Sequence, residues 1–193
     1  RTVTVIGAGV AGKEAIKKAI STGAKVNILD LSEAKLSDLE AEFGSNNIKY
    51  LISSEERIIE CISSSDLVIG SVYVVGKEAP KVVTKDMLSD MKPGSVMVDI
   101  SIDQGGCFET SKPTTHDNPI YKVEDVTHYC VTNMPGAVPL TSTLALNEAT
   151  LPFIEQIVKS GLSKSLSDNE HLAAGVNIMD GKIIHPAIKE ALN

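Results

Sequence analysis

The sequence is poor in aromatic residues and cysteine: its 193 residues include no tryptophan, three phenylalanines, four tyrosines and three cysteines. The cysteines, at positions 61, 107 and 130, are odd in number and widely spaced. This argues against a disulfide framework or a zinc site, and it indicates a reducing compartment, so we expect a cytoplasmic protein. The sequence also lacks long apolar runs, since residues 67–70 and 96–100 are far too short to cross a bilayer. No secretory signal pattern opens it.

The sequence also has fewer basic than acidic residues. Lysine and arginine number 18 against 25 aspartates and glutamates, which gives a formal net charge of −7. An acidic chain has no general attraction for phosphate backbones, so neither nucleic acid nor a membrane is an expected partner. Hydrophobic residues make up 42% and charged residues 22%, as in a folded globular protein. No metal is expected, because no two of the four histidines have metal-ligand spacing; we expect structural roles for His116, His128, His171 and His185.

Strand-length apolar runs alternate with longer amphipathic stretches over the first 140 residues. This alternation predicts an α/β fold, a Rossmann-type doubly wound parallel sheet with helices on both faces. The alternation stops after Pro139, so we expect a domain over residues 1–140 and a C-terminal helical segment over residues 141–193. Strands are expected at residues 3–6, 25–29, 48–52, 67–72, 95–100 and 127–131, and helices at 11–21, 33–43, 55–63, 85–91, 141–160, 168–175 and 186–192. Because the chain opens inside its first strand, we expect a piece of a longer protein that lacks part of any active site.

A glycine-rich turn follows the first expected strand. Residues 7–12 read Gly-Ala-Gly-Val-Ala-Gly, the G-x-G-x-x-G pattern of dinucleotide-binding folds. Gly7 permits the tight turn, Gly9 lets the backbone approach a pyrophosphate, and Gly12 lets the helix pack closely on the sheet. The helix N-terminus then offers free N–H groups to the phosphates.

Asp30 strengthens this interpretation. It ends the second expected strand, 30 − 12 = 18 residues after the last glycine, where a carboxylate accepts hydrogen bonds from the adenosine ribose. Its charge would repel a 2′-phosphate, so NAD is favoured over NADP. The alternative is that Asp30 only helps Ser32 to cap the next helix.

Two further segments end at the same edge of the sheet. Asp103 lies in a loop after the fifth expected strand, where ligands of open α/β sheets bind, although a polar turn residue beside Gly105 and Gly106 is an equal alternative. Asp99 lies within the strand and is expected to be structural. After the sixth strand, Asn133 could bind a carboxamide or ribose or close an Asx-turn, and residues 132–139 form a proline-fixed surface.

Taken together, residues 5–12, the pair Leu29–Asp30, residues 98–109 and the run Asn-Met-Pro-Gly-Ala-Val-Pro at 133–139 resemble the alanine dehydrogenase family over essentially the whole chain. The related NAD-binding subunit of proton-translocating transhydrogenase shares the fold and the Gly105–Gly106 element. It does not normally carry an aspartate at the position of Asp103, so this residue favours the dehydrogenase.

The resemblance implies oxidative deamination of L-alanine to pyruvate and ammonia, with NAD as the hydride acceptor, in a homo-oligomer. Asp103 would match the catalytic aspartate and Asp30 the ribose acid. The resemblance also implies NAD contacts from the glycine loop, the adenosine pocket, the cofactor wall and the nicotinamide end: Gly7, Gly9, Val10, Ala11 and Gly12; Asp30, Lys35 and Ser53; Val72, Tyr73 and Lys112; and Ile100, Ser101, Ile102, Asp103, Val131, Thr132, Asn133 and Met134.

One departure from the family is large. The arginine and lysine that hold the substrate carboxylate, and the histidine that transfers protons, lie in an N-terminal domain before the first strand. Neither Arg1 nor Arg57 is a plausible replacement for that arginine. The resemblance therefore implies that this chain alone is inactive, and that residues 141–193, which pack with the N-terminal domain in the family, expose an apolar face.

Overall fold

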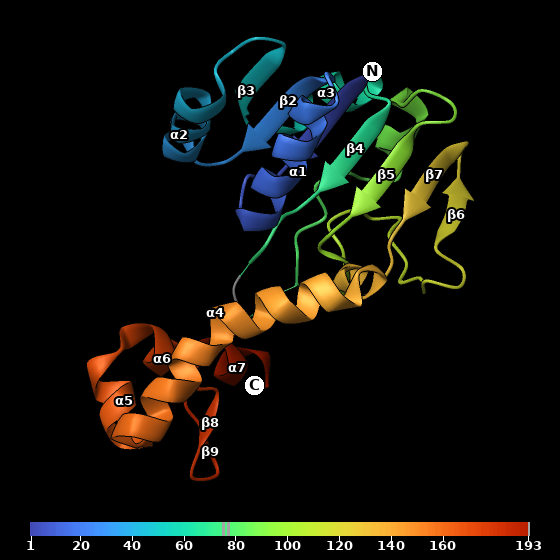
Figure 1. Cartoon of the computed structure of the whole chain (residues 1–193). Helices are drawn as coiled ribbons and strands as arrows, with labels where there is room; N and C mark the ends of the chain where they lie inside the picture. Colours follow the sequence, from blue (N-terminus) through green and yellow to red (C-terminus); the bar gives the residue numbers. More distant parts are fainter. Residues whose placement is uncertain (75, 77, 193) are drawn as a thin grey trace. The chain divides into compact units, whose positions relative to one another are not determined.

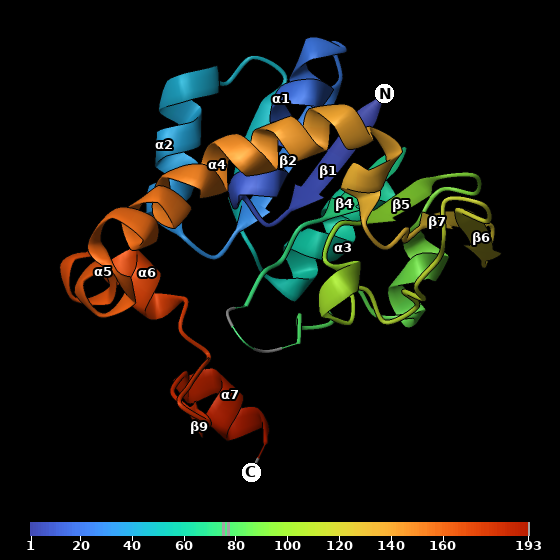
Figure 2. The same cartoon turned by 60° about the horizontal axis from the view of Figure 1, so that its bottom comes forward.

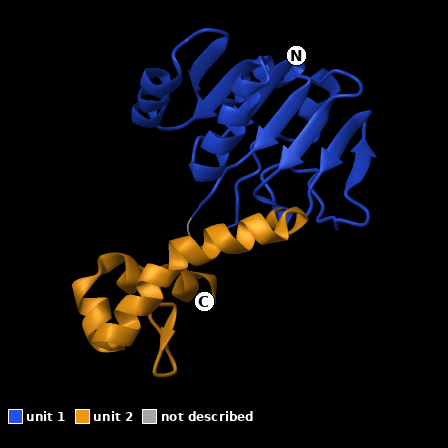
Figure 3. Ribbon diagram, in the orientation of Figure 1, with its two compact units in different colours: residues 1–74, 78–134 blue, residues 75–77, 135–193 orange. Residues whose placement is uncertain are grey.

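The computed structural model describes residues 1–74, 76 and 78–192. The chain divides into two compact units, one of residues 1–74 and 78–134 and one of residues 75–77 and 135–193 (Figure 3). The units separate after Met134, a few residues before the boundary expected near Leu140.

The first unit is built on a seven-stranded sheet in the order β3-β2-β1-β4-β5-β7-β6 (Figure 1). All neighbouring pairs are parallel except β6 and β7. The order reverses between β1 and β4, which is the switch point of a doubly wound fold. The strands are β1 (Thr2–Ile6), β2 (Lys25–Asp30), β3 (Ile48–Ile52), β4 (Leu67–Gly70), β5 (Val96–Asp99), β6 (Ile120–Val123) and β7 (Val126–Tyr129).

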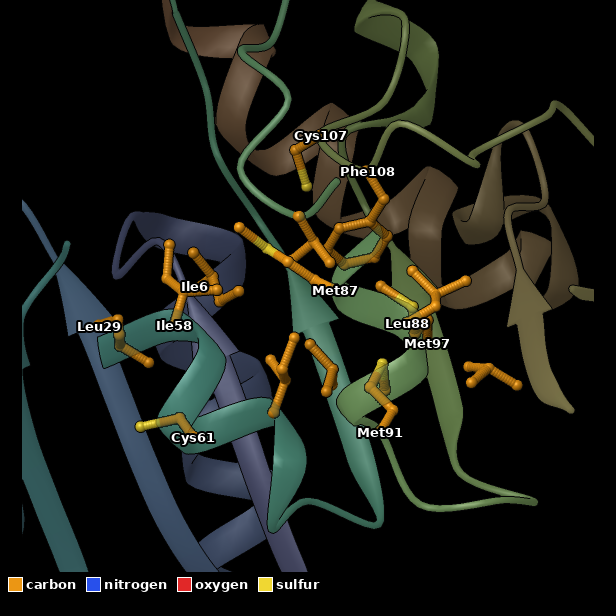
Figure 4. Close-up of a cluster of buried hydrophobic side chains, with 14 of the residues drawn as sticks. Ile6, Leu29, Ile58, Cys61, Met87, Leu88, Met91, Met97, Cys107 and Phe108 are labelled. Carbon is orange, nitrogen blue, oxygen red and sulfur yellow. The ribbon is translucent and has the colours of Figure 1, made fainter. Parts of the chain in front are cut away.

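The helices of this unit cover both faces of the sheet (Figures 1 and 2). Helices α1 (Val10–Ser21) and α2 (Glu33–Phe43) pack with Val5 and Ile28 on one face. Helix α3 (Glu55–Ser63) and the 3₁₀ helix η1 (Asp86–Asp90) pack with Ile6 and Leu29 on the other, where Phe108 is fully buried (Figure 4). Adjacent residues of one strand thus point to opposite cores, as the pleat requires.

The predicted α/β fold is confirmed, and α2, β3 and α3 have the expected bounds. The prediction missed β6, which joins the sheet through an antiparallel pair with β7. Its four residues, Ile-Tyr-Lys-Val, lie in the loop between the expected strands at 95–100 and 127–131, where no element was predicted, because a short, half-exposed edge strand has no continuous apolar run. The loop also contains the 3₁₀ helix η2 (Ile102–Gln104).

The second unit is mainly helical. Its elements are α4 (Pro139–Ser160), α5 (Leu162–Asp168), α6 (Glu170–Ala174), β8 (Ile178–Met179), β9 (Lys182–Ile183) and α7 (Pro186–Ala191), and the 3₁₀ helix η3 (Met134–Ala137) leads into it. The helix predicted over residues 168–175 begins later in the structure, at Glu170. The Asn169 side chain caps α6 there by accepting from the N–H groups of His171 and Leu172. No helix in the described ranges is long and apolar enough to cross a membrane.

Helix α4 carries an exposed apolar stripe. Leu140, Leu144, Leu151, Ile154 and Val158 are all at least half exposed. Their spacings of four, seven, three and four residues place them on one side of the helix. The expected exposed apolar face in the C-terminal segment is therefore confirmed.

Candidate nucleotide-binding site

A cleft of about 830 Å³ opens beside the carboxyl ends of β1, β2 and β4, at the switch point of the sheet. Ligands of open α/β sheets bind at this position. Nine of the residues predicted from sequence line it: Gly7, Gly9, Val10, Ala11, Asp30, Lys35, Ser53, Val72 and Tyr73.

The three glycines differ in their surroundings. Gly7 has φ +95°, and a Cβ there would collide with the backbone of Ser71. A Cβ at Gly12 would collide with the carbonyl of Gly7, whereas one at Gly9 would meet nothing within 4 Å. Gly7 and Gly12 are therefore required by the fold of the loop, while Gly9 leaves open space toward the cleft.

The glycine loop leads directly into the amino end of α1, and the first turn of this helix has no acidic residue. Its N-cap is Gly9, which has no side chain to occupy the first N–H groups. These N–H groups lack partners inside the helix and carry its partial positive charge. The arrangement suits a phosphate.

The carboxylate of Asp30 is mostly buried, with 10% of the side chain exposed. Its Oδ2 accepts from the Ala8 N–H at 2.8 Å, and its Oδ1 accepts from the Ser32 N–H at 2.9 Å. Ser32 caps α2 by accepting from the Lys35 N–H. Asp30 thus assists the helix cap, as the alternative proposed, and also holds the glycine loop, with lone pairs left on both oxygens for a ligand.

Further lining residues come from α2 and from the segments that follow β3 and β4. The Lys35 ammonium lies 3.9 Å from Oδ2 of Asp30. The Ser53 N–H donates to the Asp30 carbonyl at 2.9 Å, which fixes the residue after β3 next to the residue that ends β2. Tyr73, after β4, is 69% exposed. Among the described residues, the cleft lining therefore combines the Asp30 carboxylate, the Lys35 ammonium and apolar walls.

The loop after β5 is anchored by a buried carboxylate. Asp99 is fully buried and accepts from the N–H groups of Ser101 and Cys107 at 3.0 and 2.9 Å and from the Ser111 hydroxyl at 2.5 Å. The predicted structural role of Asp99 is confirmed. Burial, together with the nearby Asp99 charge, raises the pKa of the Cys107 thiol, so this cysteine stays protonated.

Asp103 lies in η2 at the exposed turn of this loop. Of its predicted neighbours, Ile102 is buried, Ile100 bonds through its N–H to the Gly70 carbonyl, and the Ser101 hydroxyl donates to the carbonyl of Val72 at 2.8 Å. Ser101 therefore connects the turn to the cleft wall. In the described part of the chain, residues 100–103 do not themselves line the cleft.

The remaining predicted residues also lie outside the described lining. Gly12 is buried beneath the glycine loop. Lys112 is exposed, and its N–H donates to the Tyr121 hydroxyl. Val131 is buried, Thr132 is half-buried, and Asn133 has φ +55°, with its carbonyl 3.1 Å from Nε2 of His116. Met134 is the first residue of η3.

His128 is structural, as expected. Its buried ring stacks on Tyr121 with 5.0 Å between centroids, and its nitrogens face the Thr110 hydroxyl and the Val126 carbonyl at 2.8 and 3.1 Å. Desolvation by burial lowers the pKa of His128, which favours the neutral ring.

The sequence interpretation missed part of the cleft lining. Leu31 is 83% exposed in the lining, and its position directly after Asp30 was the available signal. Pro80 and Val82 also line the cleft, from an irregular segment between β4 and η1. Nothing in the local sequence marked these two residues, because their placement depends on pairing with the distant loop of residues 104–109.

Comparisons with known proteins agree with this geometry. Residues 1–186 match the family described as alanine dehydrogenase/PNT, C-terminal domain. The chain is 53% identical over 189 residues to an alanine dehydrogenase of Halomonas elongata, covering 98% of this chain and 51% of that protein. A solved L-alanine dehydrogenase superposes with a TM-score of 0.87 at 43% identity, covering 99% of this chain and 52% of the other.

A second solved structure, the transhydrogenase from Sinorhizobium meliloti, superposes less closely. Its TM-score is 0.75 at 28% identity, covering 96% of this chain and 50% of that one. In each of these comparisons the chain spans about half the length of the protein that it matches.

Proposed function

The chain belongs to the alanine dehydrogenase/PNT C-terminal domain family, and from this premise we propose that it is the NAD-binding part of an enzyme that oxidatively deaminates L-alanine to pyruvate and ammonia. The observation that carries the proposal is the cleft at the switch point, in which the Asp30 carboxylate is hydrogen-bonded to the glycine loop. High identity to alanine dehydrogenases over nearly the whole chain supports the substrate.

The residues of the cleft fit NAD. Gly9 leaves open space where a pyrophosphate would approach, and the amino end of α1 supplies N–H groups. Asp30 would accept from the ribose hydroxyls, and Lys35 and Ser53 would lie around the adenosine. Val72 and Tyr73 would form a wall of the site. The nicotinamide end would reach toward residues 100–103 and 131–134, with Lys112 nearby.

When bound, NAD supplies a hydride acceptor for the alanine Cα. The residues of this chain would orient the bound nucleotide and place charged groups beside the reacting centre. Asp103, carried on an exposed turn, would hold or accept a proton beside the reacting centre. Asp99 stays buried beneath that turn and fixes its backbone. Substrate clamping by an arginine and a lysine, and the histidine proton steps, belong to the N-terminal part of the family's enzymes.

A second candidate function is the NAD-binding subunit of a transhydrogenase. The Gly105–Gly106 element and the superposition on the Sinorhizobium meliloti transhydrogenase favour it. Asp103 and the greater similarity to alanine dehydrogenases favour the first proposal. A nucleotide-binding module with no chemistry of its own is the third possibility.

The experiment is a spectrophotometric assay of the purified full-length protein with L-alanine and NAD. We expect alanine-dependent NADH formation, and pyruvate with ammonia should oxidise NADH in reverse. Hydride exchange between NAD(H) and NADP(H) without alanine turnover would establish the transhydrogenase alternative. NAD binding without either reaction would support the third candidate, a nucleotide-binding module with no chemistry of its own. The expected setting is a cytoplasmic homo-oligomer, which size-exclusion chromatography with light scattering and cell fractionation would test.

A further inference from the structure

The turn that carries Asp103 is held from two sides by groups of opposite charge. On the buried side, the Asp99 carboxylate accepts from the N–H groups of Ser101 and Cys107, at the two ends of the turn. On the exposed side, the Lys81 ammonium donates to the carbonyls of Gly105 and Gly106 at 2.5 and 2.7 Å. The two N–H groups at the ends of the turn thus face an anion, and two of its carbonyls face a cation.

The Lys81 hydrogen bonds complete a continuous row of bonds between residues 79–82 and residues 104–107. Four consecutive carbonyls, of residues 104–107, accept hydrogen bonds from residues 79–82. Ala79 N–H donates to Gln104 and Val82 N–H donates to Cys107. Pro80 between them has no N–H to donate. The Lys81 side chain supplies the two donors for the carbonyls in the middle.

The attached segment is also a wall of the cleft, since Pro80 and Val82 line it. Lys81 therefore joins the nucleotide cleft to the turn of Asp103. Gly105 and Gly106 both have positive φ, +84° and +77°, so this part of the turn has left-handed backbone that only the surrounding contacts fix. A Cβ at Gly106 would lie 2.7 Å from Oδ2 of Asp99, so the close approach to Asp99 requires glycine here.

We propose that Lys81 is a positioning residue for the reaction: it fixes the turn of Asp103 against the wall of the nucleotide cleft without touching substrate or cofactor. The inference rests on the proposed function. Without the ammonium, the carbonyls of Gly105 and Gly106 lose these donors, and the turn that carries Asp103 is no longer fixed at its middle to residues 79–82. Nucleotide affinity depends on the glycine loop and Asp30, so it should change little.

The test compares Lys81→Met, Lys81→Arg and the control Lys85→Met in the full-length protein. Lys85 is exposed on the same segment, and within the described residues its side chain forms no hydrogen bond to the turn. We expect Lys81→Met to lower kcat about tenfold or more, because small misplacements of a reacting group are costly, with Kd for NAD within about twofold. Lys81→Arg should recover most of kcat, and Lys85→Met should match the unmutated protein.

A second readout is independent of turnover. The N–H groups of Gly105 and Gly106 donate within the turn, to the carbonyls of Ile102 and Ser101. Their hydrogen exchange should become faster in Lys81→Met and not in Lys85→Met. If the unmutated protein has no alanine turnover, the proposed function fails. Hydrogen exchange of Gly105 and Gly106 then tests by itself whether Lys81 fixes the turn.

Four results would overturn the inference. The first two are unchanged kcat and exchange in Lys81→Met and an equal loss of kcat in Lys85→Met. The others are a loss of NAD affinity as large as the loss of kcat and failure of Lys81→Arg to recover kcat.

Discussion

Oδ2 of Asp30 accepts a hydrogen bond from the backbone N–H of Ala8 at 2.8 Å. This bond connects the end of β2 to the middle of the glycine loop, so the carboxylate that we propose to bind the ribose also holds the loop that we propose to receive the phosphates. One substitution at this position therefore changes two properties, and a test of cofactor choice must separate the charge of Asp30 from its bond to Ala8.

We expect Asp30→Ala to narrow the preference for NAD over NADP by about tenfold or more, which corresponds to ~1.4 kcal/mol, because the carboxylate repels a 2′-phosphate. Isothermal titration with each nucleotide measures the two Kd values. Asp30→Asn is the matched control, since its amide oxygen can still accept from Ala8 while the charge is gone. Equal binding of NAD and NADP by the unmutated protein would contradict the assignment of Asp30.

Asp103→Asn keeps the shape of the side chain and removes its charge. If Asp103 handles a proton, the full-length variant should lose about 10² or more in kcat while its Kd for NAD changes little. Steady-state kinetics with L-alanine and equilibrium titration with NAD give the two quantities. Turnover within a few-fold of the unmutated protein would mean that Asp103 is only a turn residue.

The sequence predicted the parts of the site that depend on local pattern. Gly7, Gly9 and Asp30 were found because one strand–turn–helix segment and the next strand end contain the whole signal. Lys81 and Pro80 were not found, because their roles arise only when residues 79–82 pair with residues 104–107. The edge strand β6 was missed for a related reason: its partner β7 defines it, not its own composition.

We expect His128 to make the stability of the fold depend on pH. Burial lowers its pKa below the usual 6.5, although the Val126 carbonyl and the Asp99 charge oppose the shift. Between the lowered value and about 6.5 the unfolded chain binds more protons than the folded one, so stability falls as the pH falls through this window. Urea denaturation from pH 7.5 to 5 should show the loss, and His128→Gln should have a smaller slope. Parallel curves for the two proteins would exclude His128 as the source.

The apolar stripe of α4 should be covered by the rest of the full-length protein. Leu144→Ala should then cost about 2–5 kcal/mol in the full-length protein, as for a buried leucine. The same change in the 193-residue chain, where Leu144 is 61% exposed, should stay within about 0.5 kcal/mol. Denaturant titrations of the unmutated protein and the Leu144→Ala variant, in both the full-length protein and the 193-residue chain, measure the two losses of unfolding free energy. Equal small effects in both would show that the stripe stays exposed.

The 193-residue chain should bind NAD and show no alanine dehydrogenase activity. Its cleft holds the glycine loop, Asp30 and the apolar walls within one compact unit, so we expect NAD binding to need nothing beyond this chain. Catalysis needs more, because without a carboxylate clamp alanine has no fixed position, and positioning contributes about 7–11 kcal/mol to such reactions. Titration with NAD and an alanine-dependent assay test the two halves separately. NADH formation would mean that the substrate site lies within this chain, whereas absence of NAD binding would mean that the cleft depends on the remainder of the protein.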